Sequence, residues 1–254
     1  MDHVIILESA RARLTVSPDD GGRLVSFVVD GHQLLHTGDA SMDPLSWGSY
    51  PMVPYAGRVD HGRFRFGGRA IQLPVTHGPH AIHGTGYLAR WDRQPDGSIV
   101  HEFPAQWPFV GRAVQRFELD DDGATFHLEV HADEPMPVSV GWHPWFVRPV
   151  EVEFHAEHMY ERDATGIPTG RVITPPAGPW DDCFRDLTAD PVLRWLAGPT
   201  VTISSNLDRW IVFDVPTHAL CVEPQSAAPD SFNHVAQVVV PGEPLRAWMR
   251  WSWS

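Results

Sequence analysis

The chain contains no lysine, and all nineteen basic residues among its 254 are arginine. Schiff-base aldolase chemistry, attachment of pyridoxal phosphate and the Walker A phosphate loop each need a lysine. The sequence therefore excludes these three kinds of site.

Cysteine and long apolar runs are also scarce. The two cysteines, Cys183 and Cys221, have neither the spacing of a metal site nor the number that a disulfide framework needs. No apolar run approaches the roughly 18 residues of a membrane span. The first residues, MDHVIILESARARL, lack the cationic segment and apolar core of a signal peptide. We therefore expect a soluble cytoplasmic protein.

Positive charge is in deficit, with 19 basic against 32 acidic residues and a net charge of −13. Nucleic acids and anionic membranes bind cationic surfaces, so neither is the expected partner. A neutral small molecule fits this charge balance. The sequence leaves open whether the protein is a monomer or a homodimer.

Short alternating runs of apolar and polar residues, separated by Gly, Pro and Asp, recur along the chain. The 24 prolines and 21 glycines oppose long helices. Strands are predicted in the ranges 63–74, 115–130, 201–206, 209–216 and 246–253. Helical turns are predicted near 181–187 and 190–196. The fold class predicted is all-β, a large antiparallel β-sandwich forming one domain over 1–254.

Aromatic side chains surround one histidine in GWHPWF, residues 141–146. In an extended strand, Val140 and Trp142 point to one face, and Gly141 and His143 point to the other. The apolar face belongs in the core. His143 is therefore expected on the small, polar face, where a ligand can reach it.

THALCVEPQ shows the same alternation, with Leu220 and Val222 on one face and Cys221 and Glu223 on the other. Glu223 and His143 are each followed by a proline, which ends a strand and stiffens the preceding position. Taken alone, each residue is also explained by a role without chemistry, as a surface glutamate or a structural histidine. Their matched position on strands and the aromatic neighbours favour an acid–base pair.

Three histidines, His77, His80 and His83, lie three residues apart in HGPHAIHG. On a strand this spacing alternates faces, and the glycines and proline between them oppose a helix. We therefore expect no metal site here, and one or two of these side chains could donate hydrogen bonds into a pocket.

Further candidates lie in segments that are expected to be loops. Arg58 belongs to PYAGRVDHGRF, and DDCF at 181–184 places two carboxylates beside an aromatic residue. The range 223–233 is rich in proline and is expected to be an ordered loop over a site. Exposed arginine and solvated acids are the ordinary alternatives. Some of the eleven tryptophans are expected to provide stacking surfaces for a ligand.

Taken in order, these motifs resemble the aldose 1-epimerases, or galactose mutarotases. The matching stretches are DDGGRLVSF, MVPYAGRVDHGRF, HAIHG followed by Trp91, GWHPWF, DDCF, CVEPQSAAPDSFN and PGEPL. Each is weak alone, but the ordered set is fairly specific. The resemblance implies a β-supersandwich fold, a sugar substrate and no cofactor.

The resemblance also implies roles for individual residues. His143 matches the general acid, and Glu223 matches the general base. Arg58 and His83 match residues that hold the substrate near its ring oxygen and anomeric carbon. Asp181 matches the aspartate that binds sugar hydroxyls.

Two positions qualify these matches. Asp182 competes with Asp181 for the hydroxyl-binding role. The family often has Asn immediately before the arginine, where this chain has Gly57.

Three alternatives stay open at this point. An epimerase of a sugar phosphate or sulfo-sugar would need a second cationic anchor, for which Arg63, Arg65 or Arg69 is available. A non-catalytic carbohydrate-binding protein would use the same cleft without an acid or a base. A metal-dependent β-barrel enzyme would use the histidines at 77–83.

Overall fold

The structure, a computed structural model, describes residues 4–39 and 41–254, which form antiparallel strands almost throughout. The helical segments in this part of the chain are three short 3-10 turns: η1 (Asp60–Gly62), η2 (Gly86–Leu88) and η3 (Ser231–Asn233). The prediction of an all-β antiparallel sandwich is confirmed.

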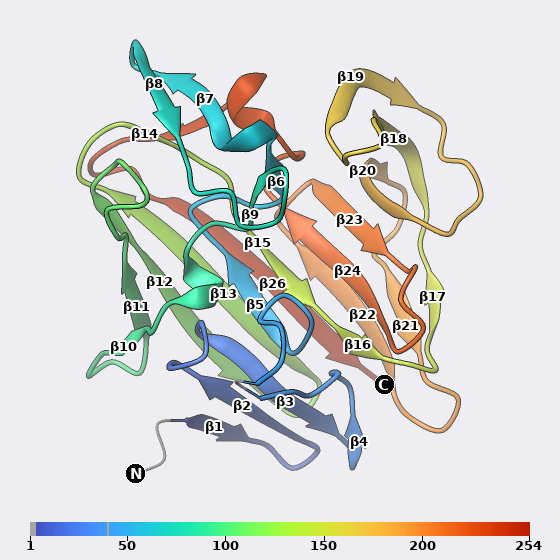
Figure 1. The fold of residues 1–254 in the computed structure, drawn as a ribbon. Coiled ribbons are helices and arrows are strands. Elements are labelled where there is room, and N and C mark those ends of the chain that lie inside the picture. Colours follow the sequence, from blue (N-terminus) through green and yellow to red (C-terminus); the bar gives the residue numbers. More distant parts are fainter. Residues whose placement is uncertain (1–3, 40) are drawn as a thin grey trace.

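Two large sheets form the sandwich (Figure 1). The larger sheet has the strand order β1 (Ile5–Glu8), β2 (Ala12–Ser17), β3 (Arg23–Val29), β5 (Ser49–Met52), β15 (Gly141–Pro144), β24 (Ala219–Gln225), β23 (Arg209–Phe213), β20 (Asp181–Leu187), β18 (Ala156–Arg162) and β19 (Pro168–Ile173). In addition, β4 (His32–Gln33) pairs with β3, and β16 (Phe146–Val147) pairs with β24.

The second sheet has the order β10 (Asp92–Arg93), β11 (Ile99–Glu102), β12 (Gly111–Leu119), β13 (Gly123–Ala132), β26 (Leu245–Trp253), β22 (Thr200–Ser205), β21 (Val192–Arg194) and β17 (Glu151–Glu153). Three two-stranded sheets pair β14 (Met136–Val138) with β25 (Gln237–Val239), β6 (Arg58–Val59) with β9 (Ala81–Ile82), and β7 (Arg63–Phe66) with β8 (Arg69–Gln72).

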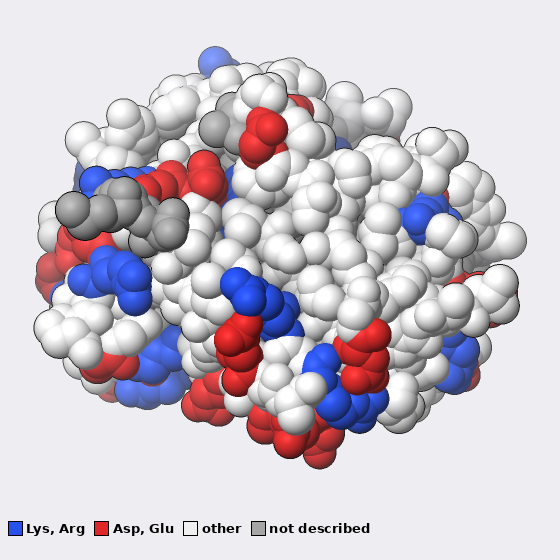
Figure 2. All heavy atoms as spheres, turned by 90° about the horizontal axis from the view of Figure 1, so that it is seen from below, with Lys and Arg blue, Asp and Glu red and all other residues white. Residues whose placement is uncertain are grey.

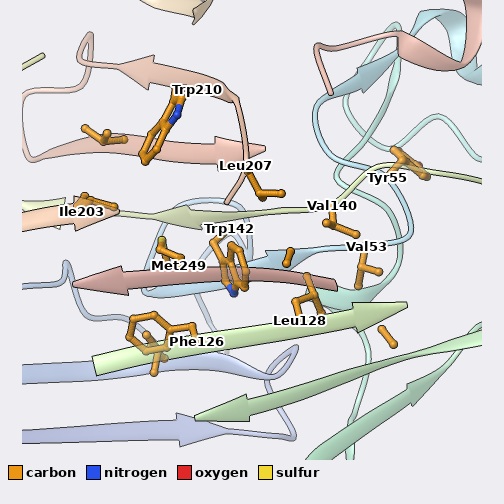
Figure 3. Packing of buried hydrophobic residues seen from close by; sticks show 14 of the residues in the cluster. Val53, Tyr55, Phe126, Leu128, Val140, Trp142, Ile203, Leu207, Trp210 and Met249 are labelled. Carbon is orange, nitrogen blue, oxygen red and sulfur yellow. The ribbon is translucent and has the colours of Figure 1, made fainter. Parts of the chain in front are cut away.

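The core lies between the two large sheets and follows from alternation along their strands (Figure 3). In β13, Phe126 and Leu128 point inward, and Met249 and Trp251 do so from the adjacent β26. The centroid of the Trp251 ring lies 5.0 Å from those of Phe126 and Phe146 and 5.4 Å from that of Phe27. A buried aromatic side chain of this size contributes several kcal/mol through the apolar surface it removes from water.

The alternation predicted at residues 138–143 and 220–223 is confirmed. Trp142 belongs to the core between the sheets, together with Leu220 and Val222. His143 and Glu223 therefore lie on the opposite face of the larger sheet, the face turned away from the second sheet.

The helical turns predicted at 181–187 and 190–196 are wrong, because these segments contain β20 and β21. Residues 181–187 hydrogen-bond to β18 on one side and β23 on the other. The loop assignments are also wrong in part: DDCF lies in β20, Arg58 lies in β6, and 223–225 belong to β24. Pairing with neighbouring strands overrode the weak local signal of Pro, Gly and Asp.

Charged groups on the face shown in Figure 2 lie as neighbours of opposite sign rather than as a broad basic surface. Near the β1–β2 turn, Arg11 pairs with Asp30 at 2.6 Å. No helix in the part of the chain that the structure describes is long and apolar enough to cross a membrane.

Candidate active site

One row of side chains crosses the larger sheet on its outer face. Tyr50 on β5 is the register partner of His143, and Glu223 on β24 is the partner of Ile211. Gly141 pairs with Gln225, so the same antiparallel register continued by two residues sets His143 opposite Glu223. Strand pairing thus brings together two residues that are far apart in the sequence.

The row continues through β20 to β18. Ile211 is the register partner of Cys183, and the pairing of Met159 with Phe184 sets Tyr160 opposite Cys183. These six residues form the floor of a cavity of about 230 Å³. Its walls are formed by strand ends and by the segments between strands, and they include Leu45, Gly57, Arg58, His77, His83, Trp145, Arg162, Asp181, Gln225 and Pro229.

The predicted acid–base residues are in contact. His143 Nε2 lies 3.2 Å from Glu223 Oε1, and both side chains are buried. The amide nitrogen of Gln225 donates a hydrogen bond of 3.1 Å to the second carboxylate oxygen of Glu223. Sequence reasoning missed Gln225, although it lies two residues after Glu223 and therefore on the same face of the strand.

Aromatic rings hold the imidazole of His143 on both faces. Tyr50 stacks at a centroid distance of 4.9 Å, and Trp145 stacks at 5.1 Å with the planes 15° apart. His83 makes an edge contact at 5.2 Å. Within the described residues, Nδ1 of His143 has no hydrogen-bond partner. Stacking and the Glu223 contact at Nε2 therefore position the ring, and of the two tryptophans in GWHPWF Trp145 is the one that stacks on it.

Burial governs the protonation of this pair. It lowers the pKa of His143 to about 3 and raises the pKa of Glu223 well above its ordinary value. Both shifts favour uncharged groups, in which the carboxyl holds one proton and the imidazole is neutral. An imidazolium beside a carboxylate also holds one proton, so the two states differ only in the position of that proton.

Three neighbours act against burial and favour the charged state. The hydrogen bond from Gln225 lowers the pKa of Glu223, because it stabilises the carboxylate. The faces of Tyr50 and Trp145 stabilise a cation between them, as aromatic rings do for imidazolium. These contacts oppose the effect of burial, which remains the larger influence on the pKa of Glu223.

Arg58 and Asp181 lie together on the wall of the cavity, with Arg58 Nη2 3.5 Å from Asp181 Oδ2. Burial raises the pKa of Asp181, and the Arg58 charge opposes that rise. Asp182 is instead bound by Arg162 at 2.7 Å and does not line the cavity. Of the two competing aspartates, Asp181 is therefore the one placed to contact a ligand.

His83 is held by the chain that carries Arg58. The N–H of Gly57 donates to His83 Nδ1 at 3.2 Å, and the carbonyl of Gly57 accepts from the N–H of His83 at 3.0 Å. Burial lowers the pKa of His83 well below its ordinary value, so the ring is neutral and its proton sits on Nε2. Gly57 has φ +69°, and a Cβ there would lie 3.1 Å from Pro229. These constraints explain a glycine at this position.

The three histidines of 77–83 do not come together as a metal site. His77 and His83 line the cavity, whereas His80 lies beside Asp60 and His61. Nδ1 of His80 already accepts the N–H of His61 at 3.1 Å, which occupies its lone pair. Within residues 4–39 and 41–254, the other cluster with metal-ligand spacing is His143, Cys221 and Glu223, in the acid–base site itself.

Arg63, Arg65 and Arg69 lie on the β7–β8 hairpin and do not line the cavity. Arg63 bonds Gln72 at 2.9 Å, and Arg69 packs over the ring of Phe109. The second cationic anchor that these residues were expected to supply is therefore not at this site.

A sequence model of the family described as Aldose 1-epimerase matches residues 3–193. The chain belongs to the aldose 1-epimerase family. YphB of Escherichia coli strain K12, an uncharacterised protein, is 34% identical over 151 residues, which is 56% of this chain and 51% of YphB. The matched region thus spans about half the length of that curated relative.

Solved structures show the same fold. A galactose mutarotase-like protein from Clostridium acetobutylicum superimposes with a TM-score of 0.88 at 17% identity, covering 99% of this chain and 95% of that chain. A galactose 1-epimerase from Lactobacillus acidophilus superimposes with a TM-score of 0.85 at 16% identity, covering 99% and 94%. At identities this low, these similarities show that the chain shares the fold of these proteins.

The titration of His143 provides a test of this site. Because burial lowers its pKa to about 3, the imidazole should stay neutral between pH 7.5 and 5. A histidine in water has a pKa of about 6.5 and would gain a proton in this range. Long-range ¹H–¹⁵N spectra of the ring nitrogens report the charge, and the His143→Asn variant assigns the signal. A midpoint near 6.5 for this residue would contradict the geometry described above.

Proposed function

We propose that this protein is an aldose 1-epimerase that interconverts the α and β anomers of an aldohexose without a cofactor. The observation that carries the proposal is the buried His143–Glu223 pair, whose Nε2 and Oε1 atoms lie 3.2 Å apart at the floor of a cavity of about 230 Å³. Anomer exchange needs one proton removed from the C1 hydroxyl and one delivered to the ring oxygen. A pair that exchanges a single proton meets both needs.

In the proposed reaction Glu223 is the general base and His143 the general acid. The carboxylate takes the proton of the C1 hydroxyl, the C1–O1 bond becomes a carbonyl, and the C1–O5 bond breaks. The electrons of that bond go to O5, which takes the proton of the imidazolium. The pair then holds its proton on Glu223, beside a neutral imidazole and an open-chain aldehyde.

Rotation about C1–C2 and the reverse transfers close the ring on its other face. His143 takes the proton from O5 as O5 attacks the carbonyl, and Glu223 returns its proton to O1. Enzyme and solvent exchange no net proton in this cycle. Burial supports this cycle, because exclusion of water keeps the proton within the pair and strengthens the electrostatic interactions of the pair with the sugar.

The remaining cavity residues are proposed to hold the sugar. His83, with its proton on Nε2, is proposed to donate to an oxygen near the anomeric carbon, together with Arg58. Asp181 is proposed to accept hydrogen bonds from ring hydroxyls. Oε1 of Gln225 lacks a partner among the described residues and is available to accept from a further hydroxyl.

The charges of the cavity favour a neutral sugar over a sugar phosphate or sulfo-sugar. Among the cavity residues that the structure describes, Arg58 and Arg162 are the arginines, and each faces an aspartate. A phosphate would have to compete with these carboxylates. A sugar-binding protein without catalysis would not need a buried acid–base pair, and rate measurements separate it from an enzyme.

The proposed base is tested by polarimetry of freshly dissolved α-D-glucose and α-D-galactose. The Glu223→Gln variant should lose about 100-fold or more of the catalysed rate, because general acid–base catalysis contributes about 10²–10⁴-fold. Glu243→Gln makes the same substitution at an exposed position and should match wild type.

Wild type that fails to exceed the spontaneous rate with either hexose would contradict the proposed function. Binding of these sugars without acceleration would identify a carbohydrate-binding protein instead.

The role of Asp181 is tested by Asp181→Asn, which keeps the shape of the side chain and removes its charge. Hydrogen bonds to charged groups contribute about 1.5–3 kcal/mol, so KM should rise at least about tenfold while kcat falls less. Asp190→Asn, at an exposed position, is the matched control. An unchanged KM for Asp181→Asn would remove this residue from the binding site.

A further inference from the structure

A second and larger cavity, of about 810 Å³, adjoins the candidate active site. The two cavities share Tyr160, Pro168 and Pro229 in their walls. The second one lies between the β18–β19 hairpin and the segment that follows β24 and includes η3, which both lie at the upper end of the molecule in Figure 1. The two cavities are therefore adjacent, and the Tyr160 side chain belongs to the wall of both.

The row of side chains that forms the floor of the first cavity leads toward this second cavity. From Glu223 the row of side chains runs across β23 and β20 to Tyr160 on β18. Three strand spacings of about 4.8 Å give roughly 14 Å, which is longer than one pyranose ring. With C1 at Glu223 and hydroxyls at Asp181 on β20, the far side of the ring is turned toward Tyr160.

Tyr160 is held as a fixed surface between the cavities. Arg209 donates a hydrogen bond of 2.8 Å from Nε to the Tyr160 hydroxyl, and its guanidinium lies over the tyrosine ring at 5.9 Å. A rigid aromatic face beside polar groups suits the apolar face and the hydroxyls of a sugar.

The charged groups of the second cavity are balanced. Its three arginines, Arg185, Arg209 and Arg246, lie 2.8, 2.7 and 3.7 Å from carboxylates of Asp186, Asp208 and Glu129. An anionic ligand would have to displace these partners, whereas a neutral polyhydroxyl compound can bond to the pairs as they stand. Small side chains such as Ala227 and Ala228 leave room on the opposite wall.

We propose that the second cavity binds the second sugar unit of a reducing disaccharide or oligosaccharide, whose reducing-end aldose occupies the catalytic cavity. This inference rests on the proposed function and names its substrate class. Binding of the second unit at Tyr160 and the Arg209–Asp208 pair raises kcat/KM for the longer sugar over that for a monosaccharide.

The experiment compares catalysed mutarotation of freshly dissolved α-D-glucose, α-lactose and β-maltose, which share a glucose reducing end, and of glucose 6-phosphate. We expect kcat/KM at least about tenfold higher for lactose or maltose than for glucose. Gln237→Trp fills the second cavity from an exposed position that does not line the first. It should abolish this preference and leave the rate with glucose unchanged, and Ala228→Trp serves as a second filling variant.

Gln106→Trp, at an exposed position lining neither cavity, is the control for the added tryptophan and should keep the preference. Glucose accelerated as well as or better than both disaccharides would overturn the second sugar site while leaving the proposed function intact. A preference for glucose 6-phosphate that Gln237→Trp abolishes would show an anion site and would also overturn it. No acceleration of any sugar would overturn the proposed function and this inference together.

Discussion

The register between β15 and β24 is the constraint on which the candidate site depends. Antiparallel pairing of Gly141 with Gln225 sets His143 opposite Glu223, and the same sheet adds Tyr50 on one side and Ile211 on the other. A shift by one residue would turn His143 into the core and bring Trp142 to the outer face. The apolar residues between the two sheets oppose that shift, since it would expose side chains such as Trp142 and Val222. The stability of the core and the geometry of the proposed chemistry therefore come from the same alternation.

Burial then gives the pair its chemical character. An exposed histidine and glutamate would each exchange protons with water, whereas His143 and Glu223 are buried and lie 3.2 Å apart. Desolvation favours the uncharged arrangement, and the Gln225 amide and the stacked rings of Tyr50 and Trp145 favour the charged one. These opposing influences bring the two arrangements closer in free energy, which a reaction that moves a proton out and back requires. Arg58 on β6 and His83 directly after β9 line the cavity wall, so the residues proposed to hold a ligand are separate from the pair proposed to transfer the proton.

Much of this could be predicted from the sequence, because strand alternation is a local property. The inward positions of Trp142 and Val222, and hence the outward ones of His143 and Glu223, follow from a period of two residues. The resemblance to aldose 1-epimerases supplied the roles proposed for Arg58, His83 and Asp181. Pairing across the sheet could not be predicted in the same way, since it joins residues far apart in the chain. The strand at 181–187 was missed for this reason, and so were the stacking of Trp145 on His143, the Gln225 contact and the second cavity beside Tyr160.

The central claim is that His143 and Glu223 act as one unit that moves a single proton. A double-mutant cycle tests it most directly, using His143→Gln, Glu223→Gln and the double variant, with anomer exchange of D-glucose followed at equilibrium by magnetisation transfer between the two H1 signals. Residues that act as a unit give non-additive losses. The account predicts that each single variant loses nearly all of the catalysed exchange and that the double variant loses no more. If the loss of the double variant relative to wild type equals the product of the two single losses, the residues act independently, and that result would contradict the claim.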